Sequence, residues 1–245
     1  MNNQAKPVSS VPSDIVGKRL KGLYENKDRS YYSHTRLEVV NMVKGKNLKI
    51  LEIGCGTGDM LAYMKEKKIA KEAVGIEIEE TAAKKAATVL DKVFVENVET
   101  FTIPYKKYFD YVIFADVLEH MLDPWDVLAR MQDVLKDDGR VVISIPNIRN
   151  MRVLKDLVMD GDWKQHTNSG STDRTHLRFF TWKTLSEMVN NAGFTVEERS
   201  ANQTNSWKHK AFDSLTMQKF ADLKIRQFII RIKKTPGGKK KKKND

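Results

Sequence analysis

The feature that most constrains this chain is a run of alternating glycines between an apolar segment and a helix-forming one. Gly54, Gly56 and Gly58 stand at every second position of the segment 51–59, Leu-Glu-Ile-Gly-Cys-Gly-Thr-Gly-Asp. Glycines at a strand-to-helix turn let the backbone adopt conformations closed to other residues and approach a ligand closely. The pattern predicts a nucleotide-type binding loop. It is not the pyrophosphate-binding fingerprint G-x-G-x-x-G, because Asp59 stands where that fingerprint requires a glycine.

Strand-like and helix-like segments alternate along the rest of the chain, which is typical of a parallel sheet with crossover helices. The strands are expected at Leu48–Ile53, Ala73–Ile78, Val93–Val95, Tyr111–Ala115, Arg140–Ile145, Phe194–Arg199 and Gln227–Ile232. The helices are expected at Tyr31–Val43, Asp59–Lys67, Glu80–Leu90, Pro124–Leu135, Trp182–Ala192 and Lys208–Leu223. Two of these helices should stop at Asp138-Gly139 and at Asn191-Ala192-Gly193. We therefore predict an α/β fold.

Hydropathy, cysteine content and charge indicate the compartment in which the chain works and the partners that its tail can contact. No apolar run approaches the ~18 residues of a membrane span, and the N-terminus lacks the apolar core of a signal peptide. The single cysteine, Cys55, excludes an intrachain disulfide. We therefore expect a cytoplasmic protein. The net charge is +11, of which Lys239–Lys243 supply five. This tail either solubilises the chain or makes weak contact with an anionic membrane or another polyanion.

Three further segments accompany the glycine loop in a fixed order. Gly-Ile-Glu-Ile places Glu77 19 residues after the last loop glycine, and Glu-Asn-Val-Glu at 96–99 follows the third strand. The fourth strand ends in Asp-Val-Leu-Glu-His at 116–120, before a helix that opens with proline. Over roughly residues 30–200 the chain resembles class I S-adenosylmethionine (SAM) methyltransferases, in particular bacterial enzymes of small-molecule and glycan pathways. The resemblance implies a Rossmann-like seven-stranded, mostly parallel sheet with helices on both faces and an antiparallel last strand.

The resemblance also implies a domain organisation. Residues 31–235 would form the methyltransferase domain, consistent with one α/β domain in a chain of 245 residues. Within it, the polar segment 146–180 breaks the alternation and would be an insertion on the acceptor side. Residues 1–30 would be a partly disordered extension, and 236–245 a disordered lysine-rich tail.

The resemblance assigns SAM as cofactor, with S-adenosylhomocysteine as product, and a role to each segment. Glu77 would accept hydrogen bonds from the ribose hydroxyls, although a solvated loop acid is the alternative. Asn97 would face the adenine, where the family more often has Asp. Arg36 would pair with the methionine carboxylate of the cofactor, unless it is a solvated helix residue. The full set of expected cofactor-binding residues is Arg36, Glu52, Gly54, Gly56, Gly58, Glu77, Ile78, Asn97, Val98 and Asp116.

Two histidines are the candidate catalytic residues. Methyl transfer depends mainly on holding the nucleophile in line with the methyl group, but an oxygen nucleophile also needs a proton acceptor, and His is the usual one near neutral pH. His120 follows the fourth strand, and His176 lies in Thr-Asp-Arg-Thr-His-Leu-Arg-Phe-Phe-Thr at 172–181. In that segment Asp173 and Arg178 are expected to bind the substrate.

Plainer interpretations of these residues stay open. His120 can be an ordinary helix-start residue, and 172–181 can be a polar loop packed by its phenylalanines, with Thr181 capping the next helix. Asp116, Glu119 and His120 resemble a cluster that holds a divalent metal in some quinone-type O-methyltransferases. Three candidate ligands in one short segment do not define a metal, so we assign none. His34, His166 and His209 are expected to be surface residues.

The predicted function is SAM-dependent methyl transfer to a small-molecule or carbohydrate-like acceptor, at oxygen. One alternative is a nucleic-acid methyltransferase, because the chain is basic, but no Asn-Pro-Pro-Tyr type sequence follows the fourth strand, so we do not expect nucleic acid as a partner. A SAM-binding protein without catalytic activity is the other alternative. The sequence names neither the acceptor nor the oligomeric state.

Overall fold

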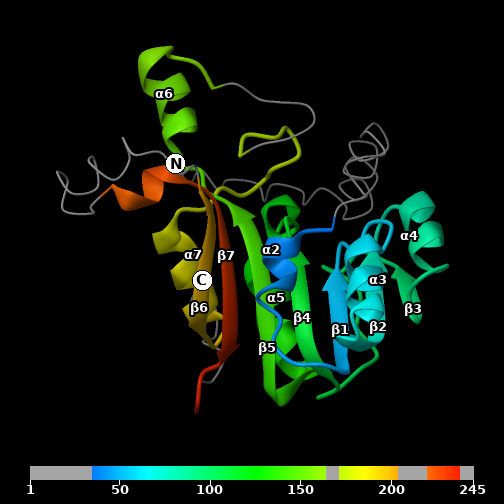
Figure 1. Cartoon of the computed structure of the whole chain (residues 1–245). Coiled ribbons are helices and arrows are strands. Elements are labelled where there is room, and N and C mark those ends of the chain that lie inside the picture. The colour runs from blue at the N-terminus through cyan, green and yellow to red at the C-terminus, as the bar shows by residue number, and fades with distance from the viewer. Residues whose placement is uncertain (1–34, 164–170, 204–219, 238–245) are drawn as a thin grey trace, which may run out of the picture.

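A seven-stranded sheet forms the centre of the molecule, and helices pack on both of its faces (Figure 1). The computed structural model describes residues 35–163, 171–203 and 220–237. The strand order is β3-β2-β1-β4-β5-β7-β6. Strands β1 to β5 pair in parallel, whereas β7 is antiparallel to both β5 and β6. The predicted fold class is therefore confirmed. The bounds are β1 Leu48–Ile53, β2 Ala70–Glu77, β3 Lys92–Val95, β4 Phe109–Ala115, β5 Leu135–Pro146, β6 Phe194–Gln203 and β7 Ile225–Lys234.

The helices begin where the sequence offers capping groups. Asp123 accepts from the N–H of Asp126 ahead of a proline at the first position of α5 (Pro124–Val134). Thr181 forms a capping box with Thr184 at the start of α7 (Trp182–Asn191). After α7, Gly193 has a φ of 78°, the left-handed conformation expected just beyond the end of a helix. The helices are α2 Leu37–Val40, α3 Asp59–Glu66, α4 Glu80–Ala86, α5 Pro124–Val134, α6 Met151–Met159 and α7 Trp182–Asn191, with short 3-10 helices η2 Leu118–His120 and η3 Ala221–Lys224.

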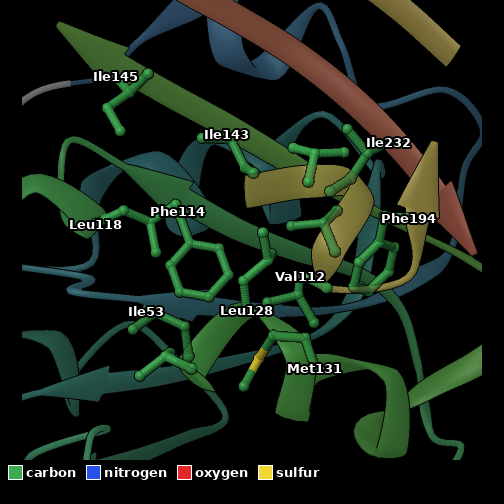
Figure 2. Close-up of a cluster of buried hydrophobic side chains, with 14 of the residues drawn as sticks. Ile53, Val112, Phe114, Leu118, Leu128, Met131, Ile143, Ile145, Phe194 and Ile232 are labelled. Atoms are coloured by element: carbon green, nitrogen blue, oxygen red, sulfur yellow. The ribbon is translucent and has the colours of Figure 1, made fainter. Parts of the chain in front are cut away.

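Two apolar cores lie on the two faces of the sheet. Successive side chains of a strand point to opposite faces, so Val112 and Phe114 of β4 join the cluster that contains α5 and α7. Figure 2 shows part of this cluster around Phe114 and Leu128. Ile113 of β4 instead joins the cluster formed with α2 and α3. Because both faces are covered, the central strands are apolar on both sides, as is usual for parallel sheets.

Two predictions about local structure are wrong. The segment 146–180 was expected to break the alternation of strands and helices, but α6 occupies part of it and is capped by Asn150, whose side chain accepts from the N–H of Arg152 at 3.1 Å. In α6, apolar residues are interleaved with the charged residues Arg152, Lys155 and Asp156. For this reason the segment was read as polar and no helix was predicted in it. Gly139 was expected to end a helix, but α5 ends at Val134 and Gly139 lies within β5. A Cβ at Gly139 would lie 3.0 Å from the carbonyl oxygen of Phe109, so this glycine permits close contact with β4.

Other expectations fall partly or wholly on residues that the structure does not describe. Of the helix expected over 31–43, residues 31–34 lie outside the described ranges, and among residues 35–43 only α2 is helical, so the expected helix is too long at both described ends. Most of the helix expected over 208–223, the extension 1–30 and nearly all of the lysine tail are also outside them. Among the residues that are described, no helix has the length and hydropathy needed to cross a membrane.

The topology places several polar residues at one edge of the sheet, the edge formed by the carboxyl ends of the parallel strands. The chain turns from β1 towards β2 on one side and continues to β4 on the other, so the strand order reverses between β1 and β4. In open α/β sheets, ligands bind outside the carboxyl ends of the strands at such a switch point. In Figure 1 the arrowheads of β1, β4 and β5 point up, and α6 lies above that edge.

Candidate functional site

The glycine loop forms the turn between β1 and α3. Gly54, Gly56 and Gly58 have φ values of 69°, 54° and 84°. A Cβ at Gly54 would lie 2.6 Å from Cγ2 of Val117, so a side chain there would clash with the segment that follows β4. Residues with a Cβ rarely adopt this region of backbone space. The loop therefore takes the tight, left-handed course that its glycines predict.

Glu77 joins the end of β2 to this loop. Its Oε2 accepts from the N–H of Gly56 at 2.8 Å, and its Oε1 accepts from the N–H of Glu79 at 2.9 Å. The side chain is buried. Burial raises the pKa of Glu77, while the hydrogen bonds from Glu79, Gly56 and Ile78 act in the opposite direction. The carboxylate thus fixes the loop against β2, and the half-buried Ile78 follows directly after the strand.

Glu52 is a second buried acid at the same edge. It is only 4% exposed, and its Oε2 has no hydrogen-bond partner among the described residues. Burial raises the pKa of Glu52 well above its ordinary value, the nearby carboxylate of Glu77 raises it further, and Arg36 opposes both. The site therefore contains a buried carboxyl oxygen without a donor, in a place where a cationic ligand would be stabilised.

The pKa of Glu52 gives a testable pH dependence of stability. Because this pKa is raised in the folded protein, the folded state holds the proton more tightly than the unfolded chain does. The resulting stabilisation is fully present below the unfolded-state pKa of about 4.3 and is lost as the pH rises through the folded-state pKa. Glu52→Gln stays neutral, so we expect the cofactor-free variant to melt about 2–4 °C higher at pH 8, a gain of about 1 kcal/mol, and at an unchanged temperature near pH 4. Equal shifts at both pH values in thermal melts would contradict this assignment.

Asp116 lies directly after β4 and is held by three partners. Its Oδ1 accepts from Oγ of Ser144 at 3.0 Å and from Nε2 of Gln227, and its Oδ2 forms an ion pair with Arg36. The residue has a φ of 57°, which turns the chain sharply at the end of the strand. Burial raises the pKa of Asp116, and the guanidinium of Arg36 is the main opposing influence.

Two of the three partners of Asp116, Ser144 and Gln227, were not among the site residues predicted from the sequence. Ser144 is next to Asp116 because β5 pairs in parallel with β4. Gln227 reaches it because β7 inserts antiparallel beside β5, with Gln227 opposite Pro146. The only sequence signal was a single amide in a strand of apolar and basic residues, and that signal does not identify a partner 111 positions away.

Asn97 begins the turn that follows β3. Its Oδ1 accepts from the N–H of Glu99 at 2.9 Å, and its carbonyl oxygen accepts from the N–H groups of Thr100 and Phe101. Val98 is buried, and its carbonyl oxygen accepts from Arg130 at 2.8 Å. The amide of Asn97 therefore has a local role in shaping this turn. Its predicted contact with adenine is not tested by these contacts.

His120 and His176 come together from segments far apart in the sequence. Their ring centroids are 4.7 Å apart, with the rings at 76° to one another. Nε2 of His176 lies 3.9 Å from Oε1 of Glu119. His120 is 8% exposed, the His176 side chain is 7% exposed, and Glu119 is 1% exposed. The two candidate catalytic residues thus form one buried cluster with a carboxylate.

Backbone carbonyls fix the protonation of both rings. Nδ1 of His120 lies 3.1 Å from the carbonyl oxygen of Thr175, and Nδ1 of His176 lies 3.2 Å from that of Ser171. A carbonyl oxygen can only accept, so in each hydrogen bond Nδ1 carries the proton and donates it. In the neutral form, each Nε2 therefore has a lone pair that can accept a proton or bind a cation.

Asp173 and Arg178 hold the segment that carries His176. Oδ1 of Asp173 accepts from the N–H and the hydroxyl of Thr175 at 2.8 and 2.7 Å, and the Asp173 side chain is buried. Nε of Arg178 donates to the carbonyl oxygen of Leu122 at 3.2 Å, and its guanidinium lies over Trp125. Both residues therefore contact protein groups, and their binding of substrate stays a prediction. His34, His166 and His209 lie outside the described residues.

Comparison with known proteins agrees with this geometry. A family model described as a methyltransferase domain matches residues 24–199. The uncharacterized protein MJ1252 of Methanocaldococcus jannaschii is 27% identical over 223 residues, covering 85% of each chain. The ubiquinone biosynthesis O-methyltransferase of Acinetobacter baumannii is 24% identical over 157 residues, covering 61% of this chain and 65% of that one.

Solved structures share the fold. The 1,6-didemethyltoxoflavin-N1-methyltransferase of Burkholderia thailandensis, with bound 1,6-didemethyltoxoflavin and S-adenosylhomocysteine, superposes with a TM-score of 0.60 at 15% identity. It covers 95% of this chain and 94% of its own. The family model spans well over half of the sequence. The chain therefore belongs to the methyltransferase-domain family and is a class I SAM-dependent methyltransferase.

Proposed function

We propose that this methyltransferase transfers a methyl group from SAM to a hydroxyl oxygen of a small-molecule or carbohydrate-like acceptor, and that His120 and His176 activate this hydroxyl. The observation that carries the proposal is the pair of buried imidazoles 4.7 Å apart, each with Nδ1 bound to a carbonyl oxygen. His120 lies four residues after Asp116, which stands at the edge of the sheet where open α/β folds bind ligands.

The residues at this edge fit a cationic cofactor. SAM is a sulfonium, and when bound it supplies the methyl group for in-line displacement by the acceptor. Glu52 offers a buried carboxyl oxygen without a donor among the described residues, and Asp116 adds a second carboxylate. A phosphate site would require Lys or free helix N–H groups instead. We assign the ribose of the cofactor to Glu77, the adenine to Asn97 and Val98, and the methionine carboxylate to Arg36.

Transfer to oxygen is supported by the histidine cluster. A neutral hydroxyl is a weak nucleophile, and a positioned imidazole that accepts its proton contributes about 10²–10⁴-fold to the rate. Each Nε2 lone pair can act on the hydroxyl directly or through a bound ion. The names of two relatives, one an O-methyltransferase of ubiquinone biosynthesis and one an N1-methyltransferase of 1,6-didemethyltoxoflavin, also favour a small acceptor.

Labelled methyl transfer tests the proposal even while the acceptor is unidentified. The purified full-length chain is incubated with methyl-labelled SAM and fractionated cell extract, and the labelled product is identified. We expect label in a small molecule or glycan, as a methyl ether. Label in nucleic acid, or attached to nitrogen, would overturn the proposed acceptor class. No labelled product together with no SAM binding would overturn the assignment of activity altogether.

A further inference from the structure

We propose that Glu119, His120 and His176 bind a divalent transition-metal ion. One ligand atom from each residue can be chosen so that all three lie within 4.8 Å of one another. Around a tetrahedral ion, ligand distances of about 2.0–2.2 Å place the donor atoms about 3.3–3.6 Å apart. The three atoms therefore need to approach one another by at most roughly 1.5 Å, which side-chain rotations can supply.

The donor set indicates the class of metal. Two imidazole nitrogens and one carboxylate suit zinc, manganese, cobalt or ferrous iron. Magnesium and calcium prefer sites made entirely of oxygen. Glu119 and His120 are adjacent in η2, while His176 comes from the segment after α6. The site thus forms only when these two segments pack together, so the sequence alone did not place His176 beside Glu119 and His120.

The tautomers of the two histidines support the assignment. Metal-binding histidines commonly donate their second ring N–H to a carbonyl or carboxylate, which orients the ring and makes the other nitrogen a better ligand. Here the Nδ1–H of His120 meets the carbonyl oxygen of Thr175, and the Nδ1–H of His176 meets that of Ser171. Both Nε2 atoms are therefore in the protonation state that a metal requires.

The backbone holds the two segments in register. The carbonyl oxygen of Glu119 accepts from the N–H groups of Leu177 and Arg178 at 2.8 and 3.0 Å. The buried side chain of Asp173 closes the turn that leads into His176. The three ligands are thus fixed by secondary structure and buried turns, which limits the entropy lost when an ion binds.

Three protein ligands leave coordination positions for another molecule. An ion in such an open site lowers the pKa of a hydroxyl that coordinates it, and it orients that oxygen. If the proposed function is correct, this hydroxyl belongs to the methyl acceptor, and its proton leaves to solvent or a neighbouring base before the oxygen attacks the methyl group. Two open positions would favour an acceptor with two adjacent oxygens, such as a vicinal diol or catechol. This last step rests on the proposed function, whereas ion binding does not.

Cobalt titration of the metal-stripped, full-length chain tests the site. Co²⁺ bound to nitrogen ligands gives visible absorption, and competition against a chromophoric chelator gives the affinity for Zn²⁺. We expect one ion per chain for the wild type and at least tenfold weaker binding in Glu119→Gln, His120→Asn and His176→Asn. Glu66→Gln is the matched control, because Glu66 is an exposed acid on α3 paired with Lys67 and should leave binding unchanged.

SAM affinity, measured by calorimetry on the same proteins, separates the two proposals. The three ligand variants should still bind SAM, which also shows that they are folded. If the wild type fails to bind Co²⁺ and Zn²⁺ in competition with the chelator, or if all three folded variants bind as the wild type does, the metal site is refuted. Metal binding with no methyl transfer under any condition would leave the site standing and refute the proposed function.

Discussion

Gly56→Val is expected to abolish measurable SAM binding, with at least a 100-fold rise in the dissociation constant. Gly56 has a φ of 54° and donates its N–H to Glu77 at 2.8 Å. A β-branched residue in this backbone region costs about 1–3 kcal/mol, so the loop should change its course and break that hydrogen bond. The added side chain would also stand between Gly54 and Gly58, where the cofactor is expected to approach the backbone. Isothermal titration calorimetry with SAM and with S-adenosylhomocysteine measures the effect.

Gly161→Val is the control for backbone strain. Gly161 has a similar φ of 62°, and a Cβ there would meet nothing within 4 Å. Valine at this position suffers the same conformational penalty at a site after α6 that we assign no role in cofactor binding. We expect Gly161→Val to bind SAM with unchanged affinity. If both variants lose binding equally, strain rather than the loop is responsible, and if neither does, the loop does not bind the cofactor.

Local sequence signals predicted the first half of the fold well. The bounds of β1 match the prediction, and α3 differs by one residue at its end. Both depend on neighbouring residues: an apolar run, then glycines, then a helix-forming stretch. The antiparallel β7 is not a local feature, and its orientation came from the resemblance to a family rather than from the residues themselves. The same is true of the roles given to Glu77 and Asn97.

The features that could not be predicted from the sequence depend on contacts between segments that are distant in the chain. Gln227 and Ser144 reach Asp116 because β5 and β7 are neighbours in the sheet. Gly139 lies within β5, and its lack of a side chain permits the close approach of β4, a contact that the local sequence does not show. His120 and His176 could each be proposed from residue type and position, but 55 residues separate His120 from the carbonyl of Thr175 that orients it. Residue type thus indicates which groups can react, and tertiary structure decides which of them meet.

The arrangement around Asp116 also links cofactor and acceptor sides of the site. Arg36, from the segment before α2, pairs with Asp116, which lies four residues before His120. Glu119 lies between Asp116 and His120 in the sequence. Its carbonyl oxygen accepts hydrogen bonds from the backbone N–H groups of the segment that carries His176. One short stretch after β4 therefore contacts the expected cofactor site at one end and the histidine cluster at the other. This continuity suits a reaction in which the acceptor oxygen must lie in line with the methyl group.

His120→Asn is expected to lower the rate of methyl transfer by about 10²–10⁴-fold, with SAM affinity within threefold of the wild type. The asparagine amide can still donate to the carbonyl oxygen of Thr175 in place of Nδ1, which lies 3.1 Å from it, so the packing of the two segments should survive. Only the Nε2 lone pair is lost. Single-turnover transfer of labelled methyl to the acceptor fraction, beside calorimetry with SAM, separates chemistry from cofactor binding. A rate within twofold of the wild type would show that His120 does not activate the acceptor, directly or through an ion, and the oxygen would need another base. A parallel loss of SAM affinity would instead place His120 in the cofactor site.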